Sequence, residues 1–236
     1  MNATLFEQTI RQSSQLSTLI QTHTNQSLSI CAVGGGPGTE LLSLAKYVLT
    51  EGLTLGAVSF TVLDSVPQWG ESWNHLADAI QGQKQQGLSV IPNINRGFFP
   101  MDVTQPTSYQ TYAWLFHDVN LFIYNYLLSE NQVRLADFGN ALNEMVARSR
   151  NGTFFVFVDR IEYAPGCHFG SQNAEDLVQL CGLTMLNKMD FADCVTDGES
   201  AFGDYINRFA PRRPRRWYRT RQNRNPTAFA VVAQKR

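Results

Sequence analysis

Residues 28–38 have the sequence LSICAVGGGPG, and residues 39–49 continue as TELLSLAKYVL. The run at 28–33 is apolar and has the length of a buried strand. Glycines and a proline then interrupt it, and after them Leu41, Leu44 and Val48 recur at helical spacing. This stretch therefore predicts a strand, a glycine-rich turn and a helix.

The alternation of strands and helices continues along the whole chain. Apolar runs predict further strands at residues 58–63, 90–101, 118–124, 153–159, 183–191 and 227–234. Helical spacing predicts helices at residues 71–80, 131–149 and 173–181. Several strands are continuously apolar, as a parallel sheet with helices on both faces requires, and no clear helix joins the last two strands. We therefore expect an α/β fold with a doubly wound, mostly parallel sheet and an antiparallel last strand.

The chain divides into an N-terminal extension and one large domain. Residues 1–27 are polar, with apolar residues such as Leu5, Ile10 and Leu16 at spacings that predict one or two amphipathic helices. Residues 28–236 hold every predicted strand, and no linker interrupts them. A chain of 236 residues suits one large domain better than two.

Composition excludes several classes of protein. Hydrophobic residues make up 43% of the chain and charged residues 17%, which is incompatible with a disordered chain. There is no unbroken apolar run of the length that a membrane span needs, and the N-terminus does not resemble a secretory signal. The four cysteines form no C-x-x-C pair and match no standard zinc spacing, so we expect no metal. These features favour an intracellular protein of the cytoplasm or nucleus.

Charge is divided very unevenly along the chain. Residues 1–204 carry 9 basic and 20 acidic residues, a net charge of −11, whereas residues 205–236 carry 10 basic residues and no acid. Seven arginines lie in the segment 211–226, PRRPRRWYRTRQNRNP, with Trp217 and Tyr218 between them. Arginine pairs with phosphate and aromatic rings stack on unpaired bases, so this basic insertion predicts a nucleic-acid partner. A solvated basic segment, or one paired with the acidic body of the chain, explains the same pattern.

The glycine turn predicts a nucleotide-like ligand. Ligands of open α/β sheets bind at the carboxyl ends of strands, and the start of a helix offers free N–H groups. A P-loop is excluded because the turn has no Gly-Lys-Ser/Thr, and the dinucleotide fingerprint fails at Thr39. Asp64 ends the second predicted strand, where a carboxylate can accept hydrogen bonds from two ribose hydroxyls. Asp102 follows the third predicted strand and can accept from the amino group of adenine, with the N–H of Val103 near a ring nitrogen.

Four motifs together carry a resemblance to a known family. They are AVGGGPGTELLSLA at 32–45, TVLD at 61–64, FPMDVTQP at 99–106 and LFIYNYLLSE at 121–130. In this order, each at the end of a predicted strand, they resemble the class I S-adenosylmethionine-dependent methyltransferases, which have a Rossmann-like fold. The resemblance extends from residue 28 to about residue 234 and implies seven strands.

The resemblance also implies the residues that bind the cofactor, S-adenosyl-L-methionine. The methionine part would lie against the glycine turn, the ribose at the end of the second strand, the adenine at the third, and the sulfonium above the fourth. The implied residues are Gly34, Gly35, Gly36, Gly38, Asp64, Ser65, Trp69, Asp102, Val103 and Asn125. Trp69 and Trp73 are four residues apart, so they either cap the adenine or form the buried face of a helix. Many members carry an acid just before the glycine turn; residues 31–33 have none, and Glu40 or main-chain carbonyls are the candidates to replace it.

The methyl acceptor stays open between RNA and protein. Tyr126 follows Asn125 at the end of the fourth strand and is placed to orient an acceptor, but the Asn-Pro-Pro-aromatic run typical of DNA or glutamine methylation is absent. Methyl transfer needs a base only when the acceptor must lose a proton. The possible bases are His117, Asp118, Glu130 and His168, although each is more often a surface or capping residue, so no catalytic residue is assigned. The basic insertion supplies the candidate residues for an acidic acceptor, which are Arg212, Arg213, Arg215, Arg216 and Trp217.

Two other classes of function compete with an active methyltransferase. The missing acid before Gly34 also fits a non-catalytic relative that acts as a scaffold and engages nucleic acid through residues 211–226. An NAD-dependent oxidoreductase is disfavoured by Thr39 and by the motif around Asp102.

Overall fold

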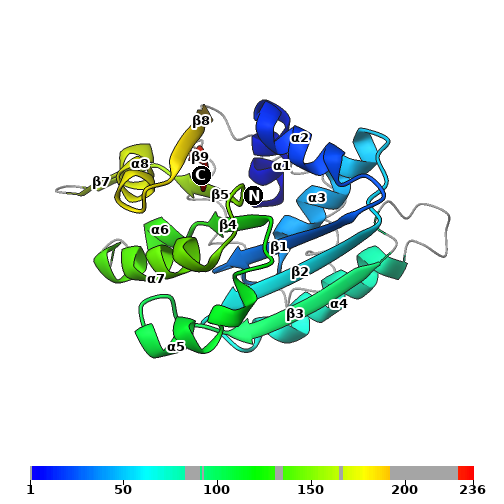
Figure 1. Cartoon of the computed structure of the whole chain (residues 1–236), viewed down its shortest axis with the longest axis horizontal. Coiled ribbons are helices and arrows are strands. Elements are labelled where there is room, and N and C mark those ends of the chain that lie inside the picture. The colour runs from blue at the N-terminus through cyan, green and yellow to red at the C-terminus, as the bar shows by residue number, and fades with distance from the viewer. Residues whose placement is uncertain (1, 83–90, 92, 131–134, 165–166, 192–227) are drawn as a thin grey trace, which may run out of the picture.

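The computed structural model describes residues 2–82, 91, 93–130, 135–164, 167–191 and 228–236. Within these residues the chain forms a seven-stranded sheet covered by helices (Figure 1) and a separate two-stranded pair. The sheet contains, in spatial order, β3 (Ile94–Pro100), β2 (Ala57–Asp64), β1 (Ser27–Val33), β4 (Leu121–Asn125), β5 (Phe154–Arg160), β9 (Ala228–Gln234) and β8 (Thr184–Phe191). The second pair is β6 (Glu162–Ala164) and β7 (Cys167–Phe169).

Strand direction follows the pattern that the sequence predicts. The four pairings among the first five strands of this order are parallel. The last strand in the chain, β9, is antiparallel to both of its neighbours, β5 and β8. The expected α/β class, the mostly parallel sheet and the antiparallel last strand are therefore confirmed.

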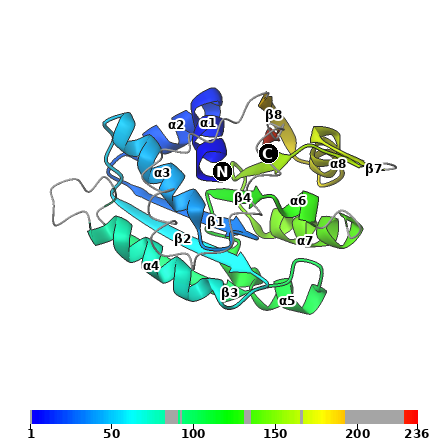
Figure 2. The ribbon, with the colours of Figure 1, turned by 180° about the vertical axis from the view of Figure 1, so that it is seen from behind.

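Helices cover both faces of the sheet (Figures 1 and 2). One face packs against α1 (Asn2–Gln12), α2 (Ser14–Thr22), α3 (Thr39–Thr50) and α4 (Trp69–Gly82). The other packs against α5 (Pro106–Thr111), α7 (Leu135–Arg148) and α8 (Ser171–Leu180). In β1, Ile30 and Ala32 enter the first core while Cys31 and Val33 enter the second. The central strands β4, β5 and β9 bury both of their faces and are therefore mostly apolar, whereas the edge strands β3 and β8 keep exposed and polar positions.

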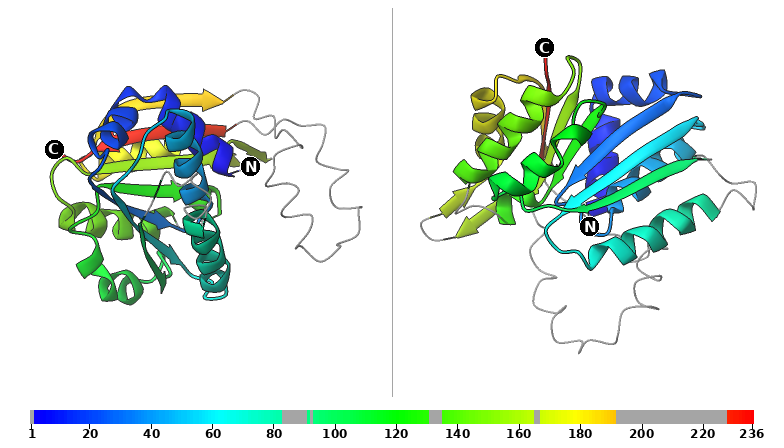
Figure 3. Two further views of the ribbon diagram at one scale, coloured as in Figure 1. Left: turned by 90° about the vertical axis from the view of Figure 1, so that its right-hand side faces the viewer. Right: turned by 60° about the horizontal axis from the view of Figure 1, so that its bottom comes forward.

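The N-terminal helices pack onto the same core as the sheet. The apolar side chains of Leu5, Phe6 and Ile10 in α1 and of Leu16 and Ile20 in α2 are at most 1% exposed. Figure 3 shows α1 and α2 lying over the sheet beside α3. Their amphipathic spacing, which predicts helices, is thus explained by burial against the first core.

Several short elements go beyond what the sequence predicts. These are α5, the 3-10 helix η2 (Ala113–Leu115), α6 (Leu127–Glu130), β6 and β7, each of three to six residues. Such elements are too short for hydrophobic periodicity to define them. Among the helices that the structure describes, none has the length and apolar character needed to cross a bilayer.

Candidate functional site

The candidate site lies where the order of the strands reverses. The chain runs from β1 outward to β2 and β3, and then returns to the opposite side of β1 to form β4. Val33 at the end of β1 is paired with both Leu63 of β2 and Tyr124 of β4. The residues that follow, Gly34, Asp64 and Asn125, therefore leave the sheet at the same level. In open α/β sheets this crevice is the usual binding place for a ligand.

The turn after β1 has a backbone that only glycine adopts easily. Gly34, Gly36 and Gly38 have φ angles of +66°, +50° and +77°. A side chain in this left-handed region costs about 1–2 kcal/mol. The Gly34 N–H donates to the Leu63 carbonyl at 2.7 Å, and the Gly38 N–H donates to the Gly35 carbonyl at 2.8 Å. The turn is thus a fixed bend that leads directly into α3.

The four glycines differ in what surrounds them. A Cβ at Gly34 would come within 2.7 Å of Leu127, one at Gly35 within 2.8 Å of Ala32, and one at Gly38 within 2.3 Å of Trp73. A Cβ at Gly36 would meet the Trp69 indole at 3.8 Å, which is ordinary contact. Three of the glycines therefore allow close packing within the protein. Gly36 has the most room of the four.

Asp64 joins the glycine bend to β2. Its side chain is 8% exposed. Its Oδ2 accepts a hydrogen bond from the Gly36 N–H at 2.8 Å, and its Oδ1 accepts one from the Val66 N–H at 2.8 Å. Each carboxylate oxygen keeps a second lone pair, so these bonds leave Asp64 able to accept from a ligand. Ser65, the next residue, is exposed beside it.

The two tryptophans of α4 lie in different environments. Trp73 is fully buried against Phe60, with ring centroids 5.2 Å apart, and it packs on Gly38. Trp69 is 40% exposed and lies beside Gly36. The structure therefore assigns Trp73 to the core and leaves Trp69 as the aromatic surface next to the bend.

Asp102 is held one strand further from the reversal point. The Met101 N–H donates to the Asp64 carbonyl at 2.8 Å, which places Asp102 just beyond Asp64 along the same edge. The Asp102 Oδ1 accepts from the Thr104 N–H at 2.8 Å and from the Thr104 hydroxyl at 2.6 Å. Oδ1 is thereby committed to the local turn, and Oδ2 is the oxygen that could accept from a ligand. The Val103 side chain is 5% exposed and belongs to the second core.

Asn125 meets Glu40 beneath the bend. The Asn125 Nδ2 donates to the Glu40 Oε1 at 2.7 Å, and the two residues are 5% and 1% exposed. Glu40 Oε2 and Asn125 Oδ1 are buried and have no hydrogen-bond partner within the described part of the chain. Burial raises the pKa of Glu40 from 4.5 to about 7, and the nearby Asp64 carboxylate adds to the rise, against the hydrogen bond from Asn125. An acid in the first turn of a helix is more often exposed, so the sequence alone does not reveal this pair.

The segment after β4 contains a strained residue and is anchored by a buried acid of β5. Tyr126 has a φ angle of +58°, a conformation uncommon for a residue other than glycine. Its N–H donates to the Val158 carbonyl at 2.9 Å. Asp159, at the end of β5, accepts from the Ser129 N–H at 2.9 Å and so anchors α6, and burial raises its pKa to about 6. Asp159 is missing from the predicted site, although its position at the end of a predicted strand is visible in the sequence.

Part of the predicted site cannot be placed. Arg212, Arg213, Arg215, Arg216 and Trp217 lie outside the described residues. Among the residues that the structure does describe, no group of three His, Cys, Asp or Glu side chains is arranged to hold a metal ion.

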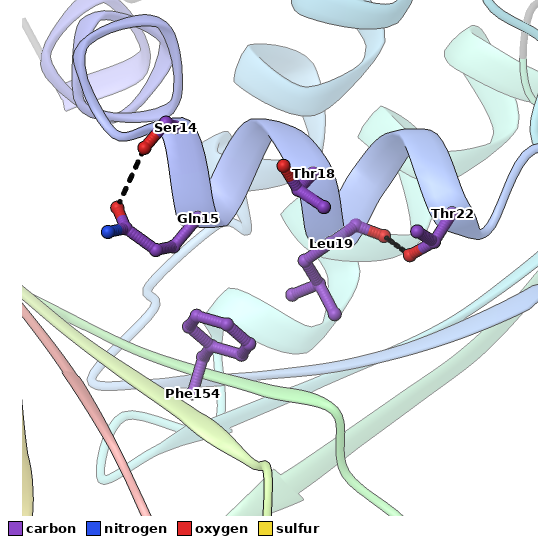
Figure 4. A pocket seen from close by; sticks show the side chains of 6 residues that line it. All are labelled: Ser14, Gln15, Thr18, Leu19, Thr22 and Phe154. Carbon is purple, nitrogen blue, oxygen red and sulfur yellow. Dashed lines mark hydrogen bonds between the residues drawn. The ribbon is translucent and has the colours of Figure 1, made fainter.

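A separate hollow of about 360 Å³ lies away from this site (Figure 4). It is lined by the outer face of α2, including Gln15, Thr18 and Leu19, and by Phe154. Phe154 begins β5, so the hollow is at the amino edge of the sheet, opposite to the glycine bend. The residues that line this hollow carry hydroxyl, amide and apolar side chains, and none of these lining side chains is charged.

The ends of β1, β2 and β3 bring together groups that can bind a polar ligand. The bend offers backbone at Gly36, Asp64 and Asp102 offer acceptors for hydroxyl and amino groups, and Trp69 offers an aromatic surface. The two unpartnered oxygens of Glu40 and Asn125 require hydrogen-bond donors.

Comparisons with known proteins agree with this geometry at the level of the fold. No known family model matches the sequence, and no curated protein matches it. Among solved structures, a S-adenosylmethionine-dependent methyltransferase from Clostridium acetobutylicum ATCC 824 is similar with a TM-score of 0.54 at 7% identity, covering 100% of this chain and 92% of the other. An antibiotic-related methyltransferase has a TM-score of 0.50 at 14% identity, covering 94% of both chains. The pyocyanin biosynthetic protein PhzM has a TM-score of 0.54 at 12% identity, covering 98% of this chain and 54% of PhzM. The chain therefore has the Rossmann-like fold of the class I S-adenosylmethionine-dependent methyltransferases, as its sequence motifs predict.

Proposed function

We propose that this chain binds S-adenosyl-L-methionine in the crevice between β1 and β4 and transfers its methyl group to an acceptor. The observation that carries this proposal is the glycine bend at the reversal point, which Asp64 ties to β2 through the Gly36 N–H at 2.8 Å. The bend, the acid and the aromatic surface of Trp69 come from separate motifs of the sequence and lie along one edge of the sheet.

Each residue of the crevice would bind one part of the cofactor. Gly36 lets the backbone approach the methionine part, Asp64 accepts from the ribose hydroxyls, and Trp69 covers one side of the bound nucleoside. Asp102 accepts from the adenine amino group through Oδ2. Ser65, next to Asp64, is exposed at the mouth of the same crevice. The cofactor supplies a methyl group on a sulfonium, whose leaving group is neutral.

Such a transfer requires little acid–base chemistry from the protein. Positioning of a nucleophile in line with the methyl group supplies most of the rate. Tyr126 follows directly after Asn125, and its backbone is fixed in a left-handed conformation by the hydrogen bond to Val158. A residue held in this way at the end of β4 is suited to orient an acceptor over the bend.

The acceptor that we propose is a nucleic acid, more specifically single-stranded RNA. This rests on the sequence of the basic insertion, in which seven arginines flank Trp217 and Tyr218 between β8 and β9. Binding of short RNA should weaken steeply as salt is raised, and replacing Arg212, Arg213, Arg215 and Arg216 by serine should flatten that dependence. A flat salt response, or equal RNA affinities of the wild type and this variant, would contradict the RNA acceptor.

A calorimetric titration tests cofactor binding. We expect S-adenosylhomocysteine to bind the wild-type chain and NAD to show no binding. The substitution Asp64→Asn keeps the size of the side chain but removes its charge and one acceptor oxygen, so the affinity should fall at least about tenfold. Asp190→Asn, an exposed acid on β8, is the matched control and should bind as the wild type does. Equal affinities of the Asp64→Asn variant and the wild type would exclude this pocket.

A further inference from the structure

The buried side chains of Glu40 and Asn125, beneath the bend, each have an oxygen that could form a further hydrogen bond. Glu40 is in the first turn of α3 and Asn125 ends β4, so the pair joins the two elements that flank the crevice. The single hydrogen bond between them, Asn125 Nδ2 to Glu40 Oε1, is 2.7 Å long. The remaining side-chain oxygens, Glu40 Oε2 and the amide oxygen Asn125 Oδ1, are buried and have no hydrogen-bond partner among the residues that the structure describes.

Asn125 Oδ1 is a hydrogen-bond acceptor, and so is Glu40 Oε2 once Glu40 is ionised. Leaving a buried polar atom unsatisfied costs about 1–3 kcal/mol, so a pair of them at one place calls for a donor. A hydroxyl offers one hydrogen, whereas a primary ammonium offers three and also carries a positive charge that offsets the carboxylate. No group of three metal-ligating side chains is present among the described residues, so an ammonium fits the pair better than a metal ion does.

The position of Glu40 and Asn125 indicates which part of the ligand the pair would contact. Glu40 follows the glycine bend by two residues, and it is close enough to the Asp64 carboxylate for the two to interact electrostatically. Residues 31–33, at the end of β1, contain no acid. The structure thus has a carboxyl group near the place where the sequence motif lacks one.

We infer that Glu40 and Asn125 together receive the amino group of the amino-acid part of the cofactor, in place of an acid at the end of β1. This inference rests on the proposed function and names the group of the ligand that the pair selects. Glu40 Oε2 and Asn125 Oδ1 each accept one N–H of the ammonium. The pair therefore discriminates between nucleosides with and without that ammonium, while the nucleoside half is recognised elsewhere.

Three ligands separate this role from a purely structural one. They are S-adenosylhomocysteine, its analogue with a hydroxyl in place of the amino group, and methylthioadenosine, which lacks the amino-acid part. The wild-type chain should bind the hydroxyl analogue at least about tenfold more weakly than S-adenosylhomocysteine in calorimetry. This comparison uses only the wild-type chain, so its result does not depend on whether a variant folds. Equal affinities for these two ligands would overturn the inference.

The substitution Glu40→Gln then tests the residue itself. We expect this substitution to lower the affinity for S-adenosylhomocysteine at least about tenfold. Methylthioadenosine should bind the variant as tightly as it binds the wild type. Glu51→Gln makes the same change at the other end of α3, where Glu51 pairs with Arg11, and it should alter neither affinity. The role of Glu40 would be contradicted if the Glu40→Gln variant lost affinity for both S-adenosylhomocysteine and methylthioadenosine, or if it lost affinity for neither. If the wild type binds S-adenosylhomocysteine but does not prefer the ammonium, the inference fails and the proposed function stands; if the wild type binds none of the three ligands, both fail.

Discussion

Gly38 shows how a single residue can be required twice, once for its backbone and once for its lack of a side chain. Its φ angle is +77°, and a Cβ would approach Trp73 to 2.3 Å. Gly52 has a similar φ angle of +63°, but no atom of the described residues lies within 4 Å of its Cβ position. The pair therefore separates the cost of backbone strain from the cost of a steric clash.

We predict that Gly38→Ala destabilises the chain considerably more than Gly52→Ala. Backbone strain alone should lower the free energy of unfolding by about 1 kcal/mol in Gly52→Ala. In Gly38→Ala the clash with the buried Trp73 should add at least about 2 kcal/mol. Urea unfolding of both variants measures the difference. Equal losses would show that Trp73 does not pack against the bend.

Glu40 makes the stability of the ligand-free chain depend on pH. Burial raises the pKa of Glu40 from 4.5 to about 7, so in this range the folded chain holds a proton that the unfolded chain releases. The charged group that faces it is Asp64 of β2, and the amide of Asn125 faces it from β4. The free energy of unfolding should therefore fall as the pH rises from 4.5 to 7, by up to about 3 kcal/mol from this residue.

Urea unfolding at pH 5 and pH 8 checks this prediction. The wild type should lose more stability between the two values than Glu40→Gln, which has no proton to release at this position. Asp159 acts in the same direction, because its pKa is raised from 3.8 to about 6, and it contributes equally to both proteins. The same loss in both proteins would show that Glu40 is ionised when the chain is folded.

At the scale of elements, helices α1 and α2 are part of the main core. Phe6 in α1 is fully buried and packs in the same core as the strands, whereas Leu49 in α3 is 54% exposed. Phe6→Ala should lower the free energy of unfolding by about 3–5 kcal/mol, and Leu49→Ala should change it by less than about 0.5 kcal/mol. Chemical unfolding followed by circular dichroism should show one transition. An unchanged stability in Phe6→Ala would mean that the N-terminal helices fold apart from the sheet.

Element lengths determine what could be predicted from the sequence. The apolar run at 153–159 corresponds to β5, because a strand buried on both faces has few polar positions; the run at 58–63 corresponds to β2, in which the half-buried Ser59 and Thr61 alternate with buried apolar residues. Elements such as α6 and β6, with four and three residues, lack a repeat that a pattern could reveal. The spacing of Trp69 and Trp73 likewise fits a helix but does not show which ring is buried, because that depends on Gly38 and Phe60 across the core.

For the molecule as a whole, the order of the strands brings the candidate site together. Gly36, Asp64 and Asn125 are separated by 28 and 61 residues in the sequence, yet the return of the chain from β3 to β4 places them on one edge. The sequence motifs predict this meeting, since each lies at the end of a strand. The contact between Glu40 and Asn125 depends on how α3 leans over β4, which no pattern in the sequence specifies.

A crystal structure of the chain with S-adenosylhomocysteine tests the central claim most directly. The account predicts the nucleoside in the crevice between β1 and β4, with its ribose hydroxyls on Asp64 and its amino acid against the bend at residues 34–38. Density for the ligand at any other place would contradict it.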